Sequence, residues 1–339
     1  WPRSPGQPQQ GSGMSQQSAR PLNPVPEEFV GDSLAQTLKR AFHATRPKFF
    51  PASALPVIVG SAWGAYASGQ FGIYIFVLAL LATVCVHAAS NVLNDVGDES
   101  IGTDARNELR IYPYTGGSRF IQTGILSQQQ MARLGITLIV IAALAGLALL
   151  VERGPMVITF GVIGIALGVF YSLGPVKLSS LGLGETAVAI AFGVLPVTGA
   201  AWLQGAVIDS TLIVFSIPVS AWVAAILLIN EVPDAEADGS CGKNTLPVRL
   251  GLGGTANLYF AIQVIAAGAV TLLAVQGHLP LLAPLVPAGL LVLAWKAATG
   301  IRGGIENRET MAQSIEATLG IHTIGCLWLA GCALFALWF

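Results

Sequence analysis

The stretch LGITLIVIAALAGLALLV, residues 134–151, contains no charged side chain and decides the class of this protein. A helix needs ~20 mostly apolar residues to cross the hydrocarbon core of a bilayer, and this stretch with its flanks meets that length. The whole chain is 53% hydrophobic and only 10% charged, with a mean hydropathy of +0.68. These values exclude an ordinary soluble domain and predict an all-α, polytopic membrane protein.

Apolar stretches of this kind recur along the chain and predict nine transmembrane helices. Pro196 and Pro218 lie inside two of them and should kink those helices, which neighbouring helices can tolerate. Pro280 and Pro284 either begin the eighth helix or break it. The expected spans are residues 49–69, 72–93, 131–151, 155–173, 181–203, 211–230, 254–276, 280–298 and 318–338.

The N-terminal segment differs in composition from the rest. Residues 1–40 are rich in Gln, Pro, Ser and Gly and predict a disordered segment, followed by one transmembrane domain over residues 41–339. Residues 1–13 resemble an artificial extension, with Met14 as the native start. The four cysteines have no metal-ligand spacing, so we expect reduced packing residues at Cys85, Cys241, Cys326 and Cys332.

The basic residues predict the orientation. With nine spans, every one of the 17 Lys and Arg residues except Arg153 falls on the side of the N-terminus and of the loops after the even-numbered helices. Basic residues in short loops mark the cytoplasmic side. We therefore expect an integral protein of the bacterial inner (plasma) membrane, with that side facing the cytoplasm.

Two acidic segments follow apolar spans on the cytoplasmic side and are expected to be loops at helix ends. They read NVLNDVGDESIGTD, residues 91–104, and NEVPDAEAD, residues 230–238. Side chains four apart share one face of a helix, so each segment offers a fan of oxygen atoms. Oxygen ligands without nearby His or Cys suit Mg²⁺ carrying phosphates. The predicted metal ligands are Asn94, Asp95, Asp98, Asp104, Asp234 and Asp238. The alternative is that these residues are ordinary helix caps and solvated charges.

Cations on the same side complete a site for a diphosphate. A departing diphosphate must be stabilised by Mg²⁺ and by positive side chains as charge develops on it. Lys177 and Arg119 lie in Gly-containing turns beside the acidic segments, and Lys243 follows the second. The predicted diphosphate-binding residues are Lys177, Arg119, Lys243, Arg46, Asn94 and Asn230. The predicted catalytic residues are Asp98, Asp234 and Lys177.

These motifs resemble the UbiA superfamily of integral-membrane prenyltransferases, over about 290 residues from Thr45 onward. The Asn-x-x-x-Asp motif with a further Asp is similar to Asn94, Asp98 and Asp104, and the Asp-x-x-x-Asp motif to Asp234 and Asp238. The resemblance implies a nine-helix bundle of the UbiA type. It also implies two Mg²⁺ ions on a prenyl diphosphate, with Lys177 contacting that diphosphate.

Within the superfamily the chain looks most like the 1,4-dihydroxy-2-naphthoate prenyltransferases of menaquinone biosynthesis. The similarity lies in the spacing of Asp98 and Asp104 and in residues 115–118 and 121–127. The segment Asn230-Glu-Val-Pro-Asp234 departs from that branch, which often has Asn-Asn-x-Arg-Asp there. The expected reaction is transfer of an allylic isoprenoid chain from its diphosphate to an aromatic ring, through ionisation and electrophilic alkylation.

Several alternatives stay open on the sequence alone. A membrane terpene cyclase on the same scaffold would keep every metal ligand, and a prenyltransferase could use another aromatic acceptor. A transporter is a remote alternative, because its ionisable groups usually lie near the middle of the bilayer. Chain length and oligomeric state are also open, and no nucleic-acid partner is expected. Candidate bases for ring deprotonation are Glu185, Tyr112, Tyr114 and His87.

Overall fold

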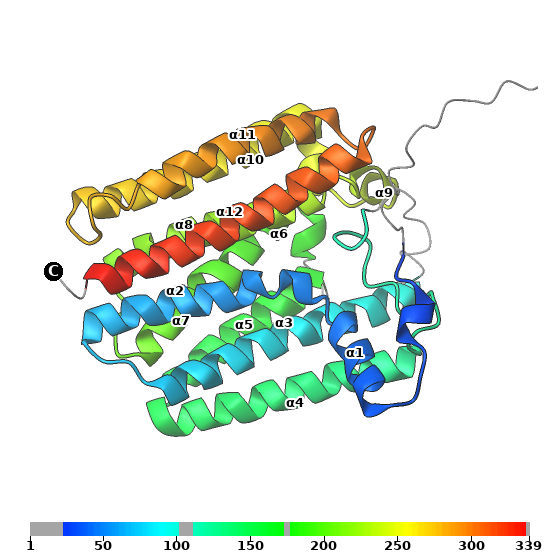
Figure 1. Cartoon of the computed structure of the whole chain (residues 1–339), viewed down its shortest axis with the longest axis horizontal. Helices are drawn as coiled ribbons and strands as arrows, with labels where there is room; N and C mark the ends of the chain where they lie inside the picture. Colours follow the sequence, from blue (N-terminus) through cyan, green and yellow to red (C-terminus); the bar gives the residue numbers. More distant parts are fainter. Residues whose placement is uncertain (1–22, 102–110, 173–176, 337–339) are drawn as a thin grey trace, which may run out of the picture.

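A bundle of long helices makes up the protein in this computed structural model, which describes residues 23–101, 111–172 and 177–336 (Figure 1). Every regular element in this part of the chain is helical. The long helices are α2 (Pro51–Ser68), α3 (Ile73–Ile101), α4 (Gln128–Arg153), α5 (Met156–Ser172), α8 (Ser210–Asn230), α10 (Leu246–Val275), α11 (Leu285–Gly303) and α12 (Arg308–Phe335). One more rod is built from α6 (Gly184–Val188), η5 (Ala189–Val194) and α7 (Leu195–Leu203).

These helices confirm the prediction of a polytopic membrane protein. In the described residues, eight helical segments are long and apolar enough to cross a bilayer, and the shorter apolar helix α5 makes a ninth. The outer helix α4 exposes large apolar side chains, with Leu144 62% and Val151 80% exposed. Such a surface is stable against lipid and costly against water. The chain is an integral membrane protein.

The ends of several helices differ from the predicted bounds. The first acidic segment was predicted as a loop, but α3 continues helically to Ile101. Helix α12 begins ten residues earlier than predicted, because its first turns are helical although they carry Arg308. Helix α10 starts with a short helical piece from Leu246, but the chain kinks at Gly251 (φ 65°, ψ 177°), so its continuous part begins close to the predicted residue 254. Pro284 caps α11 rather than breaking it, so that helix covers Leu285–Gly303 instead of residues 280–298.

Small residues let the central helices approach closely. Helix α2 packs against α7 and α12, and α8 packs against α10 and η5. A side chain on Gly60 of α2 would collide with the backbone of Val197 in α7, and one on Gly193 with Ser220 of α8. Without a hydrophobic drive between helices in lipid, such close backbone contact is a main source of stability. The largest fully buried side chains of this core include Trp222 and Tyr259.

Proline explains the irregular turn η5. Pro196 has no N–H to donate to the carbonyl four residues earlier, so the regular helical pattern cannot run through this position. The chain forms a π-helical segment over Ala189–Val194 just before it. Pro218, by contrast, lies inside a continuous α8.

Short elements gather at one end of the bundle. They are η1 (Pro26–Phe29), α1 (Leu34–Ala44), η2 (Pro47–Phe49), η4 (Leu178–Ser180) and α9 (Ala235–Ser240). Ser33 is the N-cap of helix α1, and its hydroxyl accepts a hydrogen bond from the backbone N–H of Gln36. The described part of the segment expected to be disordered, residues 23–40, therefore contains η1 and the first two turns of α1.

Three of the four cysteines are buried. Cys85, Cys326 and Cys332 lie in the interior, Cys241 is exposed after α9, and all four are free thiols.

Candidate active site

Both acidic segments lie at the same end of the bundle. Helix α3 carries the first at its C-terminus, and α8 leads into the second through the turn before α9 (Figure 1). The C-terminus of the described chain lies at the other end. We call the end with α9 the acidic end. This placement is the one that the sequence predicted.

The last turns of α3 carry the first acidic cluster. Asp95 is only 3% exposed, and its carboxylate accepts a hydrogen bond from the backbone N–H of Ser118 at 3.0 Å. Gln122 donates from Nε2 to the Glu99 carboxylate at 2.8 Å. Both contacts fasten the connection after α3 to this helix. Asp95 therefore has a structural function beside its predicted one.

Other predicted ligands of this cluster are only partly visible. Asn94 lies on the exposed side of α3. Asp104 lies outside the described residues, as does the side chain of Asp98. The backbone of Asp98 is part of α3, one turn beyond Asn94, so the two positions share a helix face.

Two arginines reach the first cluster from distant parts of the chain. Arg46 and Arg119 lie close enough to Asp95 for their positive charges to act on its carboxylate. Both have left-handed backbone conformations, with φ of 59° and 64°. Residues other than glycine seldom adopt this conformation, which costs about 1–2 kcal/mol. Such strain concentrates at functional sites.

The position of Arg46 is fixed from two sides. The side chain of Asn91 in α3 donates to the carbonyl of Thr45 at 3.1 Å. The guanidinium of Arg46 donates from Nη2 to the carbonyl of Tyr114 at 3.0 Å. These bonds join the start of the membrane domain, α3 and the connection after α3 into one unit.

The second acidic cluster begins where α8 ends. The backbone turns over residues 231–234 and then forms α9, with the N–H of Asp238 donating to the carbonyl of Asp234 at 2.9 Å. Lys243 makes an ion pair with Asp238, with 2.9 Å between Nζ and Oδ1. Sequence reasoning placed these three residues together, and the structure brings Lys243 and Asp238 into contact.

The connection after α5 packs beside this second cluster. Lys177 is exposed and precedes η4. The N–H of Asn244, one residue after Lys243, donates to the carbonyl of Ser180 at 3.0 Å. This bond ties the Lys177 connection to the segment that follows α9.

The sequence did not predict that two carboxyl groups beside the second cluster form a pair. Glu185, predicted only as a candidate base, is 5% exposed in the first turn of α6. It is hydrogen bonded to Glu231, which follows α8 directly. Burial, followed by the charge of Glu185 and its hydrogen bond, raises the pKa of the Glu231 carboxyl far above its ordinary value. The sequence signal that could have revealed Glu231 is its position directly after a long apolar span.

The oxygen atoms available as metal ligands at this end suit a hard cation. In the described part of the chain, Glu185 Oε1, Asn230 Oδ1 and Glu231 Oε2 are buried and have no hydrogen-bond partner. Buried oxygen atoms without partners are costly unless a ligand satisfies them. The same part of the chain contains no preassembled group of three His, Cys, Asp or Glu side chains at metal-binding distance. A cation here would therefore be held by oxygen atoms of protein and substrate together, as Mg²⁺ often is.

The remaining candidate bases have different environments. His87 is buried, with Nδ1 2.9 Å from the Ser53 hydroxyl and its ring against Phe192. It is a packing residue of α3. The Tyr114 hydroxyl donates to Glu316 at 2.8 Å, which ties α12 to the acidic end. Tyr112 is half-buried at the edge of a cavity.

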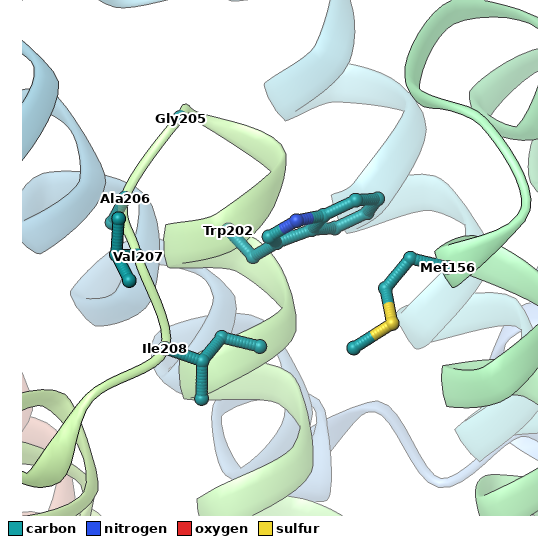
Figure 2. Close-up of a pocket in the computed structure, with 6 residues that line it drawn as sticks. All are labelled: Met156, Trp202, Gly205, Ala206, Val207 and Ile208. Atoms are coloured by element: carbon teal, nitrogen blue, oxygen red, sulfur yellow. The ribbon is translucent and has the colours of Figure 1, made fainter.

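The opposite end of the bundle also has a hollow. An apolar pocket of about 450 Å³ lies between the start of α5 and the connection after α7. In Figure 2, Trp202 and Met156 extend toward each other across it, with Ile208 below Trp202. Its lining has no charged residue. It lies away from both acidic clusters and offers no group for diphosphate chemistry.

Comparison with known proteins identifies relatives of this chain. The family model described as the UbiA prenyltransferase family matches residues 53–310. The chain is 35% identical over 224 residues to the 1,4-dihydroxy-2-naphthoate octaprenyltransferase of Haemophilus influenzae, covering 64% of this chain and 70% of that protein. It is 29% identical over 266 residues to the enzyme of that name from Mycobacterium tuberculosis, covering 78% and 86%.

Solved structures share the fold. The structure of a UbiA homologue from Archaeoglobus fulgidus bound to GPP and Mg²⁺ superposes with a TM-score of 0.63 at 16% identity, covering 87% of this chain and 99% of that one. A UbiA homologue from Aeropyrum pernix gives a TM-score of 0.61 at 18% identity, covering 83% and 97%. The family match, which covers most of the chain, and the shared bundle show that this protein belongs to the UbiA prenyltransferase family and is a membrane-embedded transferase.

Proposed function

We propose that this protein transfers a polyprenyl chain from its allylic diphosphate to 1,4-dihydroxy-2-naphthoate, at the acidic end of the bundle. The observation that carries the proposal is that two acidic clusters and several cations lie at the same end of an apolar helix bundle. The names of the relatives from H. influenzae and M. tuberculosis support the naphthoate acceptor. Residues 41–339 form the proposed catalytic domain.

The acidic residues would hold the metal. The A. fulgidus homologue, whose structure is bound to GPP and Mg²⁺, supports divalent cations as cofactors, and we propose two Mg²⁺ ions. When bound, Mg²⁺ neutralises the negative charge of a diphosphate. Oxygen atoms at the end of α3 and around α9 provide the ligands. The proposed metal ligands are Asn94, Asp95, Asp98, Asp104, Asp234 and Asp238.

Basic and amide side chains would bind the diphosphate itself. Lys243 is held at the second acidic cluster by its ion pair with Asp238, and its ammonium group would donate to a diphosphate oxygen. Positive groups that are fixed before the reaction stabilise the charge developing on the departing diphosphate. The proposed diphosphate-binding residues are Lys177, Arg119, Lys243, Arg46, Asn94 and Asn230. Loss of the diphosphate leaves an allylic cation, and the electron-rich naphthoate ring attacks its C1. The ring carbon that forms the new bond then loses its proton, which restores the aromatic ring.

The membrane would supply the polyprenyl substrate. Helices that pack through Gly and Ala leave room for an apolar tail between them. We propose that the acidic end faces the cytoplasm of a bacterial inner membrane, because the basic residues concentrate there.

Product analysis tests this proposal directly. Purified protein is incubated with a polyprenyl diphosphate and 1,4-dihydroxy-2-naphthoate, with and without Mg²⁺, and the prenylated product and free diphosphate are both measured. We expect both to form only when substrate, acceptor and Mg²⁺ are present. Diphosphate release without an acceptor would indicate a cyclase or hydrolase instead. Absence of prenylated naphthoate in the complete reaction would contradict the proposal.

A further inference from the structure

Helix α1 (Leu34–Ala44) has its large apolar side chains on the outside of the protein. Leu34, Leu38 and Phe42 are 74%, 60% and 55% exposed. They are four residues apart, so they form one stripe along the helix. Val30, shortly before the helix, is exposed as well. A contiguous apolar stripe is costly in water, so an apolar medium or partner is expected to cover it.

The basic face of α1 is turned into the protein. Lys39 donates from Nζ to the carbonyl of Glu28 at 2.9 Å. Arg40 donates from Nη1 to the carbonyl of Gly31 at 2.7 Å. Ala44, at the end of the helix, is fully buried in a cluster with residues of α3 and α4. A surface helix in water turns its charged face outward and its apolar face to the core. The orientation of α1 is the reverse, so its outer face suits an apolar surrounding.

The chain places α1 at the surface of the membrane. Ala44 is three residues before Pro47, where the first candidate span begins. Consecutive Cα atoms are about 3.8 Å apart, so the end of α1 lies within about 11 Å of that span. In Figure 1, α1 lies at the acidic end and runs across the long helices rather than along them. Because those helices cross the bilayer, α1 lies along the bilayer surface.

The apolar stripe continues into the lipid-facing surface of the bundle. The ring of Phe42 meets that of Phe50 edge to face, with 6.3 Å between centroids. Phe50 directly precedes α2, and its ring centroid lies 6.2 Å from that of His87 in α3. Val86, next to His87, is 54% exposed on α3. The lipid that covers α3 at this level therefore adjoins the stripe on α1.

The small size of the stripe argues against a protein partner. A helix of 11 residues is about 16 Å long and about 10 Å wide, so one face of it covers roughly 160 Å². A stable protein–protein interface buries about 800 Å² on each partner. A bilayer needs no such area, because the transmembrane bundle already holds the helix at its surface.

We infer that α1 is an interfacial helix, which lies in the membrane surface with its stripe of Leu34, Leu38 and Phe42 among the glycerol groups and upper acyl chains of the lipid. Helices of this kind insert their apolar face about 5–10 Å into the boundary between headgroups and acyl chains. Only Thr45 separates α1 from Arg46, so the lipid contact also bears on the position of that arginine. This inference does not depend on the proposed reaction.

Spin labels on the full chain in phospholipid nanodiscs test the inference. The exposed cysteine is removed by Cys241→Ser, and the label is attached at Leu38→Cys. Leu144→Cys on α4 is the lipid reference, and Glu306→Cys in the exposed connection after α11 is the water reference. Cys241→Ser alone gives the background from the buried cysteines. Collisions of each label with O₂, which concentrates in lipid, and with a water-soluble nickel chelate are measured.

The label at Leu38→Cys should behave as the one at Leu144→Cys does. We expect its ratio of O₂ to nickel collisions to be several-fold above that at Glu306→Cys, at a depth of about 5–10 Å. A ratio equal to that at Glu306→Cys would place the stripe in water and overturn the inference. Low accessibility to both reagents would place protein on the stripe, and spin–spin broadening would identify a second copy of the chain. Either result would overturn the inference as well.

Proteolysis gives a second readout that needs no label. Leu38→Glu puts a charge on the stripe. Thr37→Glu, outside the stripe, is the matched control, because its carboxylate can still accept from Arg40 as the Thr37 hydroxyl does. Trypsin cleaves after Lys39 and Arg40 only when α1 opens locally. Loss of one lipid-buried Leu side chain should speed this cleavage at least roughly tenfold in Leu38→Glu relative to Thr37→Glu. Equal cleavage rates in the two variants would overturn the inference.

Discussion

The two ends of the bundle differ in how they connect helices and in what they hold. At the opposite end the connections cover only residues 69–72, 154–155, 204–209 and 276–284. At the acidic end, three of the four connections, residues 102–127, 173–183 and 231–245, are longer. The longer connections follow the first acidic cluster at the end of α3, carry the second cluster, and contain Arg119, Lys177 and Lys243. The connections at the opposite end only link consecutive helices, whereas those at the acidic end are long enough to form a site.

Left-handed backbone conformations occur at both ends. Glycine adopts them in turns, as at Gly69 and Gly154 of the opposite end and at Gly242 of the acidic end. At the acidic end Arg46 and Arg119 adopt positive φ as well. Glycine relieves this strain where only a turn is needed. An arginine at a position where glycine would be less strained indicates that its side chain is needed. Substitutions at the two ends therefore test how each end contributes to activity.

The largest expected effect is at the second acidic cluster. Asp234→Ala should lower kcat roughly 10³-fold or more, because it removes a ligand for the cation that stabilises the departing diphosphate. Steady-state prenylation assays check this, with gel filtration in detergent to establish folding. Activity within a few-fold of the unsubstituted protein would remove Asp234 from the proposed metal site.

Loss of Lys177 should have a smaller effect. Lys177→Ala removes one positive charge from the diphosphate site and should lower kcat roughly 10²-fold, as loss of a single oxyanion donor does. Arg153→Ala, the corresponding loss of a cation at the opposite end, should leave kcat unchanged. Equal effects of the two substitutions would break the distinction between the ends.

Arg119 tests the meaning of the strained backbone. Arg119→Gly relieves a left-handed conformation worth about 1–2 kcal/mol, so the melting temperature should not fall by much. Activity should nevertheless fall roughly tenfold, because a cation near the diphosphate is lost. A thermal melt and a kinetic assay on the same sample give the comparison. A destabilised but fully active variant would make Arg119 a purely structural residue.

The smallest effect on activity is expected at an acid of the opposite end. Asp209 caps α8, with Oδ1 accepting from the N–H of Leu212 at 2.8 Å. Asp209→Ala should cost about 1 kcal/mol of stability through the lost cap. Its kcat and KM should remain those of the unsubstituted protein. A loss of activity comparable to that of Asp234→Ala would show that acids at both ends serve the reaction.

Composition made the spans predictable, whereas the helix ends were not. Long runs without charge show where lipid must be crossed, so nine apolar helices followed directly. The first turns of α12, and the short piece of α10 before the kink at Gly251, were missed because they carry Arg308 and Arg249 and lie outside the apolar part of the helix. The end of α3 was missed because Gly97 and several acids are typical of loops. Hydropathy detects the membrane-buried part of a helix, not its length.

The clusters were predictable where residues are near in sequence, and less so where distant segments meet. Asp234, Asp238 and Lys243 lie within ten residues, so their proximity was expected and the structure shows an ion pair. Glu185 in α6 and Glu231 directly after α8 are far apart in sequence, and only the fold reveals that they are hydrogen bonded.

Binding of an unreactive substrate analogue tests the central claim most directly. A prenyl thiolodiphosphate, which ionises poorly, is titrated into the full chain in detergent with and without Mg²⁺, and the heat of binding is recorded. We expect Mg²⁺-dependent binding that is retained in Asp209→Ala and lost in Asp234→Ala. Binding that needs no divalent cation, or that survives unchanged in Asp234→Ala, would contradict a metal and diphosphate site at the acidic end.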